Sequence, residues 1–154
     1  MLDPAALYHL GVVVPDLNEA LADLGRRYGL SWGPRHEAQR TVWLEGAVVE
    51  VGFRTCFSVQ TPHLEVIEAV PGTIWEQPSG SALHHLGYWT DDVASCSESL
   101  EAAGSPRAAC GVAADGTNPS RFAYHRDPRG YFVEVVSTSI RAEMEARWQP
   151  AGRA

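Results

Sequence analysis

The chain has 154 residues, of which 45% are hydrophobic, and it carries a formal net charge of −7 with a pI of about 5.3. This length predicts one globular domain, and an acidic chain without a basic cluster argues against nucleic acids and anionic membranes as partners. No apolar run is long enough to span a bilayer, and the first residues lack the pattern of a signal peptide. Three cysteines without CxxC spacing indicate reduced thiols in a cytoplasmic protein.

The first half of the sequence predicts a strand, a helix and then further strands. Residues 7–14 form a mostly apolar run that suits a buried strand and ends before Pro15. Asp16 is placed to cap the helix that follows, with Glu19 as its capping-box partner, and Gly29 is placed to end it. The further strands are predicted at 41–44, 48–53, 56–59 and 63–70.

The second half repeats this order after a connector at residues 71–82, which contains proline, glycine and serine. A strand at 83–90 precedes a helix that Asp92 begins and Gly104 ends. Three strands are predicted next, at 108–112, 121–125 and 131–136, and then a short amphipathic helix at 139–148. The sequence therefore predicts two βαβββ modules, at about 7–70 and 83–137, within a single domain that spans 1–154.

Each predicted module contains one histidine and one glutamate in corresponding strands. The tripeptide His-Leu-Gly begins at His9 and again at His85, each time before an acidic turn and a helix. A glutamate also stands inside an apolar strand of each module, at Glu65 and Glu134. Such a duplication predicts that equivalent side chains meet across a pseudo-twofold axis. His84, beside the second of these histidines, is expected to point the other way.

The alternation of side chains along the strands is consistent with one shared site. If His9 faces a cavity, Gly11 shares that face, and the apolar Leu10 and Val12 face the helix. Burying an unpaired glutamate in a strand is costly, and a cation shared with the histidines removes that cost. Two imidazoles and two carboxylates suit Zn²⁺, Ni²⁺, Co²⁺, Mn²⁺ or Fe²⁺. A single strand histidine is more often an ordinary core residue, but the repeated context favours a divalent metal site.

Three segments of the chain resemble the vicinal oxygen chelate superfamily, namely YHLGVVVPDL at 8–17, HLGYWTDD at 85–92 and DPRGYFVEV at 127–135. This superfamily includes glyoxalase I, methylmalonyl-CoA epimerase, extradiol dioxygenases and bleomycin-resistance proteins. The resemblance implies an α+β fold of two βαβββ modules whose curved mixed sheets enclose a central metal cavity. It implies that the metal ligands are His9, Glu65, His85 and Glu134. Because many small members pair, it also implies a homodimer.

The resemblance implies proton transfer next to a carbonyl group. In such enzymes the metal binds two neighbouring oxygens of a small carbonyl substrate and stabilises the enediolate formed when a C–H proton leaves. The general base would be Glu134 or Glu65. Glu45 and Glu50, on the middle strands, are other candidates, although a solvated carboxylate at a sheet edge is the more frequent case.

The wall of a substrate pocket is expected from four residues, Trp89, Tyr124, His125 and Arg54. Trp89 shares a strand face with the histidine four residues before it. Tyr124 and His125 are adjacent on one strand, so only one of them can face inward. Arg54, like Arg121, offers a guanidinium to a carboxylate or phosphate, although a surface arginine is the more frequent case.

Three functions are compatible with these residues. A metal-dependent isomerase, epimerase or lyase of the glyoxalase I or methylmalonyl-CoA epimerase type would act on a small-molecule carbonyl substrate and use all four ligands. A dioxygenase would need Fe²⁺ and would leave one of the four positions without a ligand role. A binding or resistance protein would hold a small hydrophobic molecule between the modules and would not need a metal. The complete ligand set favours the first function.

Overall fold

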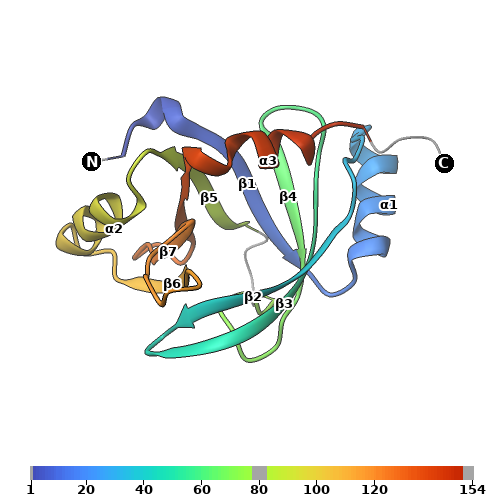
Figure 1. Ribbon diagram of the computed structural model, residues 1–154. Helices are drawn as coiled ribbons and strands as arrows, with labels where there is room; N and C mark the ends of the chain where they lie inside the picture. Colours follow the sequence, from blue (N-terminus) through green and yellow to red (C-terminus); the bar gives the residue numbers. More distant parts are fainter. Residues whose placement is uncertain (1, 78–82, 151–154) are drawn as a thin grey trace.

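The structure is a computed structural model that describes residues 2–77 and 83–150, and its elements follow the order βαβββ twice before a C-terminal helix (Figure 1). The first module contains β1 (Leu7–Val14), α1 (Leu17–Tyr28), β2 (His36–Leu44), β3 (Ala47–Phe57) and β4 (His63–Glu68). The second contains β5 (Leu83–Thr90), α2 (Val93–Ala102), β6 (Arg107–Gly111), β7 (Phe122–Arg126) and β8 (Phe132–Ser137). Short 3₁₀ turns at Pro4–Ala6 and Thr138–Ile140 flank the modules, and α3 (Arg141–Ala146) follows.

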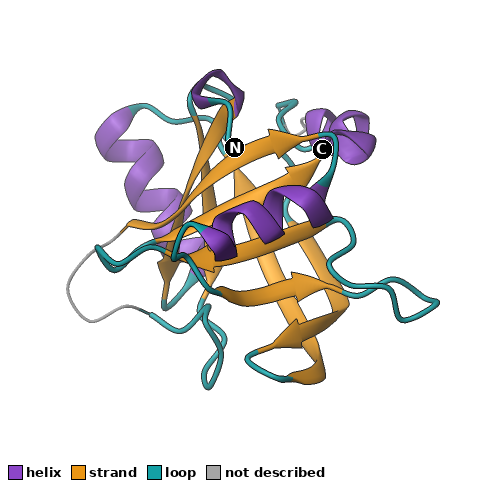
Figure 2. Cartoon of the chain, turned by 90° about the vertical axis from the view of Figure 1, so that its left-hand side faces the viewer, coloured by secondary structure: helices purple, strands orange, loops and turns teal. Residues whose placement is uncertain are grey.

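The described strands form one closed barrel in the order β1-β4-β3-β2-β6-β7-β8-β5. In each module the first strand pairs with the last in parallel, whereas the other neighbours are antiparallel. The two modules are joined along two antiparallel seams, one between β1 and β5 and one between β2 and β6. In Figures 1 and 2 the helices lie outside the curved strands. The predicted α+β fold with two βαβββ modules around a central cavity is confirmed.

Helix ends follow the predicted capping residues. The Asp16 side chain accepts a hydrogen bond from the backbone N–H of Glu19 at 2.8 Å, and Gly29 ends α1 with a φ of 68°. Glycine tolerates this left-handed conformation because it has no Cβ. The equivalent Asp92 accepts from the backbone N–H of Ser95 at 3.0 Å and begins α2.

The middle of the first module differs from the prediction. The strands expected at 41–44, 48–53 and 56–59 are two long strands, because β2 begins at His36 and β3 continues without a break to Phe57. A tight turn at Glu45 and Gly46, with φ values of 47° and 107°, joins them as a hairpin. Arg54, which falls between two of the expected strands, occupies an outward position of a continuous strand. The C-terminal helix is also shorter than predicted, since a 3₁₀ turn precedes it.

Each of the first two helices covers the outer face of its own module. On α1, Leu17 and Leu21 pack against Cys56 and Val66, which point outward from β3 and β4. The equivalent packing in the second module joins α2 to β6, β7 and β8. The side chains that alternate with these outward residues fill the inside of the barrel. The predicted alternation of β1 is therefore observed, with every second residue from His9 to Val13 buried.

Two apolar clusters inside the barrel leave a polar region between them. One cluster contains Val13 and Ile67, which follow His9 and Glu65 along the inner faces of β1 and β4. The other contains Trp89 and Val136, together with Met144 of α3. The four candidate ligands lie where neither cluster fills the interior.

Two predictions from composition concern cysteines and membranes. Cys56 and Cys110 are buried, Cys96 is partly buried, and all three are free thiols. None of the described helices is long and apolar enough to cross a membrane.

Candidate metal centre and cavity

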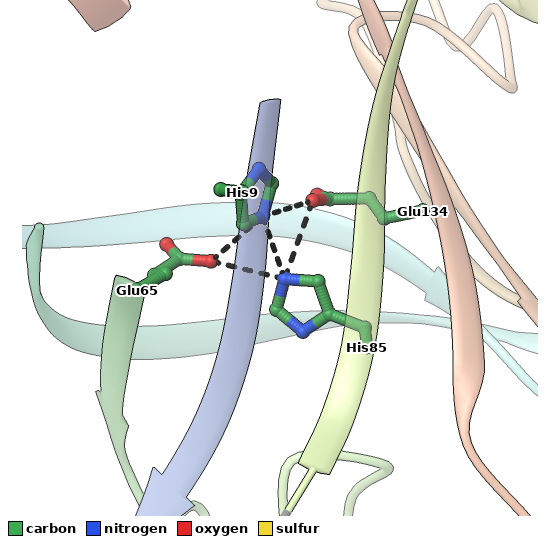
Figure 3. Close-up of side chains that lie close together, drawn as sticks. All are labelled: His9, Glu65, His85 and Glu134. Carbon is green, nitrogen blue, oxygen red and sulfur yellow. Dashed lines mark hydrogen bonds and ion pairs between the residues drawn. The ribbon is translucent and has the colours of Figure 1, made fainter. Parts of the chain in front are cut away.

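His9, Glu65, His85 and Glu134 point toward one another from β1, β4, β5 and β8 (Figure 3). One donor atom of each side chain lies within 4.8 Å of those of the other three. The two histidine Nε2 atoms are 2.7 Å apart, and each lies 3.1 to 3.5 Å from a carboxylate oxygen of each glutamate. All four residues are at least nine-tenths buried. The structure thus brings together the four residues that the repeat singled out.

The register of the strands explains why these side chains meet. Gly11 pairs with Glu65 of β4 on one side and with His85 of β5 on the other. Gly87 has the equivalent position, opposite Glu134 of β8 and His9 of β1. Each glycine therefore stands between the glutamate of its own module and the histidine of the other module. This arrangement has the pseudo-twofold relation that the duplication predicts.

The two glycines also provide space for the imidazole rings. A Cβ at Gly11 would lie 1.8 Å from Cε1 of His85, and a Cβ at Gly87 would lie 1.9 Å from Cε1 of His9. Any side chain at either position would overlap the histidine ring of the opposite module. The glycine of the His-Leu-Gly repeat is thus part of the site. Strand alternation alone does not predict that this glycine makes room for a histidine ring. The occurrence of the glycine in both copies of the repeat was the indication that it belongs to the site.

The histidines and glutamates of the site shift the pKa values of His9 and Glu65 toward the charged forms. Burial alone would lower the pKa of His9, but hydrogen bonds to Glu134 and Glu65 outweigh it and raise the pKa from 6.5 to about 9. Burial alone would raise the pKa of Glu65, but the neighbouring His85 and His9 outweigh it and hold this pKa well below its ordinary value. A divalent cation at this position would stabilise the two buried carboxylates.

The donor set fits a divalent transition metal. Ligand atoms about 2.1 Å from a common ion and at right angles lie about 3.0 Å apart, and the separations of 2.7 to 3.5 Å are close to this value. Imidazole nitrogen and carboxylate oxygen suit Zn²⁺, Ni²⁺, Co²⁺, Mn²⁺ and Fe²⁺. Burial of the donors adds to the fit, since two carboxylates and two imidazoles in the interior need compensation.

His84 orients one of the candidate ligands. Its Nε2 lies 2.7 Å from the carbonyl oxygen of Ile74, so this nitrogen must donate. Its Nδ1 lies 2.9 Å from Nδ1 of His85 and accepts a hydrogen bond there. Burial, followed by the effect of His85, lowers the pKa of His84 to about 4, so the ring is neutral. The contact leaves Nε2 of His85 free of a proton and directed at the site.

His84 leaves the inner strand face, as alternation predicts. A side chain at this place near the start of a strand could be partly exposed, but His84 is 3% exposed, because it lies against the connector at Ile74. Contact between adjacent side chains at the start of a strand does not follow from alternation. The equivalent position of the first module is occupied by Tyr8, and Nδ1 of His9 has no hydrogen-bond partner in the described part of the chain.

A cavity of about 600 Å³ opens onto the candidate ligands. Glu65, Glu134 and His9 form part of its lining. Its wall combines aromatic rings with three arginines, and it includes Tyr8, Phe57, Trp75, Tyr124, Arg40, Arg121 and Arg147. This volume is in the range of sites for small molecules.

The structure separates Tyr124 from His125, as alternation requires. Tyr124 is buried in the cavity wall, and its ring lies 5.2 Å from that of His85, measured between centroids. His125 points to the other face of β7, where its Nδ1 lies 2.9 Å from the carbonyl oxygen of Ser105. Of this adjacent pair, Tyr124 is the residue that can contact a ligand.

The other two expected pocket residues lie away from the cavity surface. Trp89 is on the inner face of β5, as its spacing from His85 predicts, but Tyr8 stacks on it at 4.0 Å between ring centroids and lies toward the cavity. Arg54 lies on the outside of β3, where it forms an ion pair with Glu68 at 2.6 Å and another with Glu37. Its guanidinium is thus already satisfied by protein carboxylates.

The remaining candidate bases and anchors are at the surface. Glu45 is paired with Arg126, and Glu50 accepts a hydrogen bond from Thr41, both at exposed positions. Arg121 lines the cavity, but it forms an ion pair with Glu143. The two buried glutamates are therefore the carboxylates in contact with the candidate centre.

A closed barrel of two βαβββ modules, with two histidines and two glutamates buried at its centre, is the architecture of vicinal oxygen chelate proteins. Residues 8–124 match the family model described as the Glyoxalase/Bleomycin resistance protein/Dioxygenase superfamily, and the chain belongs to this superfamily. The resemblance seen in the sequence is thereby confirmed. No curated protein sequence matches the chain.

Solved structures with the same fold are distant in sequence. Methylmalonyl-CoA epimerase from Mycobacterium tuberculosis is 19% identical, with 92% of this chain and 97% of that chain covered and a TM-score of 0.59. A variant of the Streptomyces coelicolor epimerase in complex with 2-nitronate-propionyl-CoA is 17% identical, with coverages of 87% and 97% and a TM-score of 0.57. A variant of 4-hydroxymandelate synthase from Streptomyces coelicolor is 15% identical, with coverages of 85% and 48% and a TM-score of 0.53. These likenesses establish the fold alone.

Proposed function

We propose that the protein is a divalent-metal-dependent isomerase, epimerase or lyase that moves a proton next to the carbonyl group of a small substrate. The observation that carries this proposal is the convergence of four buried donors, His9, Glu65, His85 and Glu134, at one cavity. A bound Zn²⁺, Ni²⁺, Co²⁺, Mn²⁺ or Fe²⁺ ion would supply Lewis-acid polarisation of the carbonyl oxygen. The homodimer and the cytoplasmic location stay predictions.

The two glutamates are the candidates for the general base. Both line the cavity and are at least nine-tenths buried. Because the neighbouring histidines hold the pKa of Glu65 below its ordinary value, this carboxyl is ionised at neutral pH, as a general base must be. Glu134 lies symmetrically across the pseudo-twofold axis. The base is therefore Glu65 or Glu134.

Two tyrosine hydroxyls are available as hydrogen-bond donors to a substrate. Burial, with the charges of Glu134 and Glu65, raises the pKa of Tyr124 and of Tyr8 well above 10. Both hydroxyls therefore keep their protons at neutral pH. A protonated phenol beside a developing negative charge stabilises it by hydrogen bonding.

The apolar part of the wall favours a second candidate, a binding protein that holds its ligand without chemistry. Phe57, Trp75 and Tyr124 offer aromatic surface to the cavity. Such a protein would bind its ligand equally well after the metal is removed. The complete donor set supports the enzyme, since a binding protein has no need of two buried carboxylates.

The test is proton exchange at carbon. Metal-loaded protein is incubated in D₂O with a panel of 2-oxoacids, hemithioacetals and 2-substituted malonyl thioesters, and loss of the C–H signal is followed by NMR. We expect exchange with at least one class, and a loss of at least about 100-fold in Glu134→Gln or Glu65→Gln. Glu45→Gln, at an exposed position, is the matched control. Metal content is measured for every variant, so that lost chemistry is distinguished from lost metal.

Three results would overturn the proposal. Exchange that persists without metal would exclude metal-dependent chemistry. Oxygen uptake that requires Fe²⁺, without exchange, would indicate a dioxygenase. Ligand binding that survives removal of the metal, with no turnover of any class, would indicate a binding protein.

A further inference from the structure

We propose that Arg147, with Arg40 beside it, binds an anionic group of the substrate, so that the substrate is a carbonyl compound that also carries a carboxylate or phosphate. This inference rests on the proposed function, because it places the carbonyl end of the same molecule at the metal centre. It concerns residues outside the four candidate ligands. Three features support it, namely the way α3 is held, the surroundings of Arg147, and the balance of charge in the cavity.

The segment that carries Arg147 is docked firmly on the barrel. In Figure 1, α3 lies along the barrel between α1 and α2. Met144 on α3 is buried against Phe57 and Trp89. After Arg147, Trp148 stacks on His63 with 4.1 Å between ring centroids. The side chain between these two contacts is therefore held in place before any ligand arrives.

Gly33 fixes the backbone at Arg147 itself. A Cβ at Gly33 would lie 1.9 Å from the carbonyl oxygen of Arg147, so the two backbones are in direct contact. This contact requires a glycine, and it sets the distance of the arginine from the barrel. The backbone position of Arg147 is thus determined by packing on both sides.

The guanidinium of Arg147 lines the cavity without an anionic partner. Its Cζ lies 5.7 Å from the ring centre of Phe57, and its Nη1 lies 3.6 Å from Sδ of Met144. Among residues 2–77 and 83–150, no carboxylate oxygen lies within 4.0 Å of it. Arg121 and Arg54, in contrast, are each paired with a glutamate. A partly buried cation without a counter-ion is costly, and an anion of the ligand would compensate it.

Two further basic groups share this side of the cavity. Arg40 lines the cavity, with its Nη2 3.4 Å from Nε2 of His36. His36, Arg40 and Arg147 all line the cavity, and burial, followed by the charges of Arg147 and Arg40, lowers the pKa of His36. The acidic groups of the lining are Glu143, which is paired with Arg121, and the two candidate metal ligands.

The balance of charge changes when the centre is filled. A divalent cation would neutralise the two ligand carboxylates, and the positive charge of Arg147 and Arg40 would then have no counterpart in the cavity. The buried hydroxyl of Tyr8 has no hydrogen-bond partner in the described part of the chain. Tyr8 lines the same cavity as Glu134 and Arg147. A substrate that spans from the centre to Arg147 would pass this hydroxyl.

The chemistry of the site selects the ligand class. A guanidinium forms paired hydrogen bonds with the oxygens of a carboxylate or a phosphate. The ligand therefore has a pair of oxygens for the metal at one end and an anionic group at the other. A neutral carbonyl compound of the same size would leave the arginines uncompensated.

Matched hydroxamates test this inference. Protein loaded with Co²⁺ is titrated with acetohydroxamate, which has no charged tail, and with hydroxamates that end in a carboxylate, a phosphonate or a primary amide at two chain lengths. Binding is followed by the visible spectrum of Co²⁺ and by calorimetry. We expect one anionic tail to bind at least about 10-fold more tightly than the amide of the same length. The preferred anion distinguishes a carboxylate substrate from a phosphate substrate.

Three variants assign the effect to the cavity. Arg147→Gln should abolish the preference for the anionic tail and change acetohydroxamate binding less than about twofold, and Arg40→Gln should reduce the preference. Arg141→Gln is the matched control, because it removes the same charge from the start of α3, where the guanidinium lies over Trp89 rather than in the cavity. Arg40 lies on β2, so Arg40→Gln still tests the preference for an anionic tail if Arg147→Gln disturbs the docking of α3.

The outcomes separate this inference from the proposed function. Equal affinity for charged and neutral tails, or an equal loss in Arg141→Gln, would overturn the anion site while leaving the metal centre intact. Failure to bind Co²⁺ would overturn the proposed function instead. In that case binding of succinate and of methylphosphonate to the metal-free protein is measured by NMR, and the anion site stands only if Arg147→Gln abolishes it.

Discussion

Replacing Gly11 or Gly87 by alanine should release the metal without unfolding the barrel. Neither glycine has a positive φ, so alanine is compatible with the backbone at both positions. The obstacle is the imidazole ring of the opposite module. The new Cβ would lie 1.8 Å from His85 in the first variant and 1.9 Å from His9 in the second.

The displacement that this overlap demands is large on the scale of a metal bond. To reach the ordinary contact distance of 3.4 Å, the His85 ring must withdraw from Gly11→Ala by about 1.6 Å. Metal–nitrogen bonds of about 2.1 Å tolerate changes of only about 0.2 Å. The variant therefore loses one ligand, and we expect its metal affinity to fall by at least about 100-fold. Overpacking should lower the free energy of unfolding by about 1 to 3 kcal/mol.

The assay is competition for Zn²⁺ or Co²⁺ with a chelating dye, alongside urea unfolding. Gly52→Ala is the control, because its Cβ would lie 3.0 Å from the flexible end of Gln39, outside the site. It should bind metal as the wild type does. Wild-type affinity in Gly11→Ala or Gly87→Ala, with a folded barrel, would refute the placement of the two rings and their role as ligands.

Three further predictions concern orientation and stability. His84→Ala removes the acceptor that holds His85, and metal affinity in the dye competition should fall by about 10- to 100-fold; an unchanged affinity would show that the contact has no role. Asp16→Ala removes the cap of α1 and should lower the free energy of unfolding in urea by about 1 kcal/mol, whereas an altered metal content would contradict the separation of helix and site. Hydrogen bonds from Ser95 lower the pKa of Asp92, so its contribution to stability is present above pH 3.8 and is lost as the pH falls through the lower pKa of the folded state. The urea midpoint of the wild type should therefore fall more steeply below pH 4 than that of Asp92→Asn, and parallel curves would contradict this.

The fold and the four central residues could be predicted because the information was repeated and local. The His-Leu-Gly tripeptide occurs twice, each time before an Asp cap, and the strand alternation around His9 and Glu65 places apolar side chains toward the helices. Capping, alternation and glycine at helix ends depend on neighbouring residues and need no tertiary contact.

The rest of the site depends on contacts between distant parts of the chain. The docking of Arg147 requires that α3 returns to Phe57 and that Gly33 leaves room for its backbone. The orientation of His85 requires the carbonyl of Ile74, which comes from the connector. Neither contact is announced by a periodic pattern in the sequence. For an adjacent pair such as Tyr124 and His125, the sequence cannot tell which side chain faces inward until the register of the strand is known.

The most direct test of the metal centre is the metal content of untagged protein, purified without chelator and measured by elemental analysis beside Glu134→Ala and the exposed control Glu45→Ala. We expect about one divalent transition-metal ion per chain in the wild type and in Glu45→Ala, and a loss of at least about tenfold in Glu134→Ala. Wild-type protein that holds no such ion, even after reconstitution, would contradict the metal centre on which the proposed function rests.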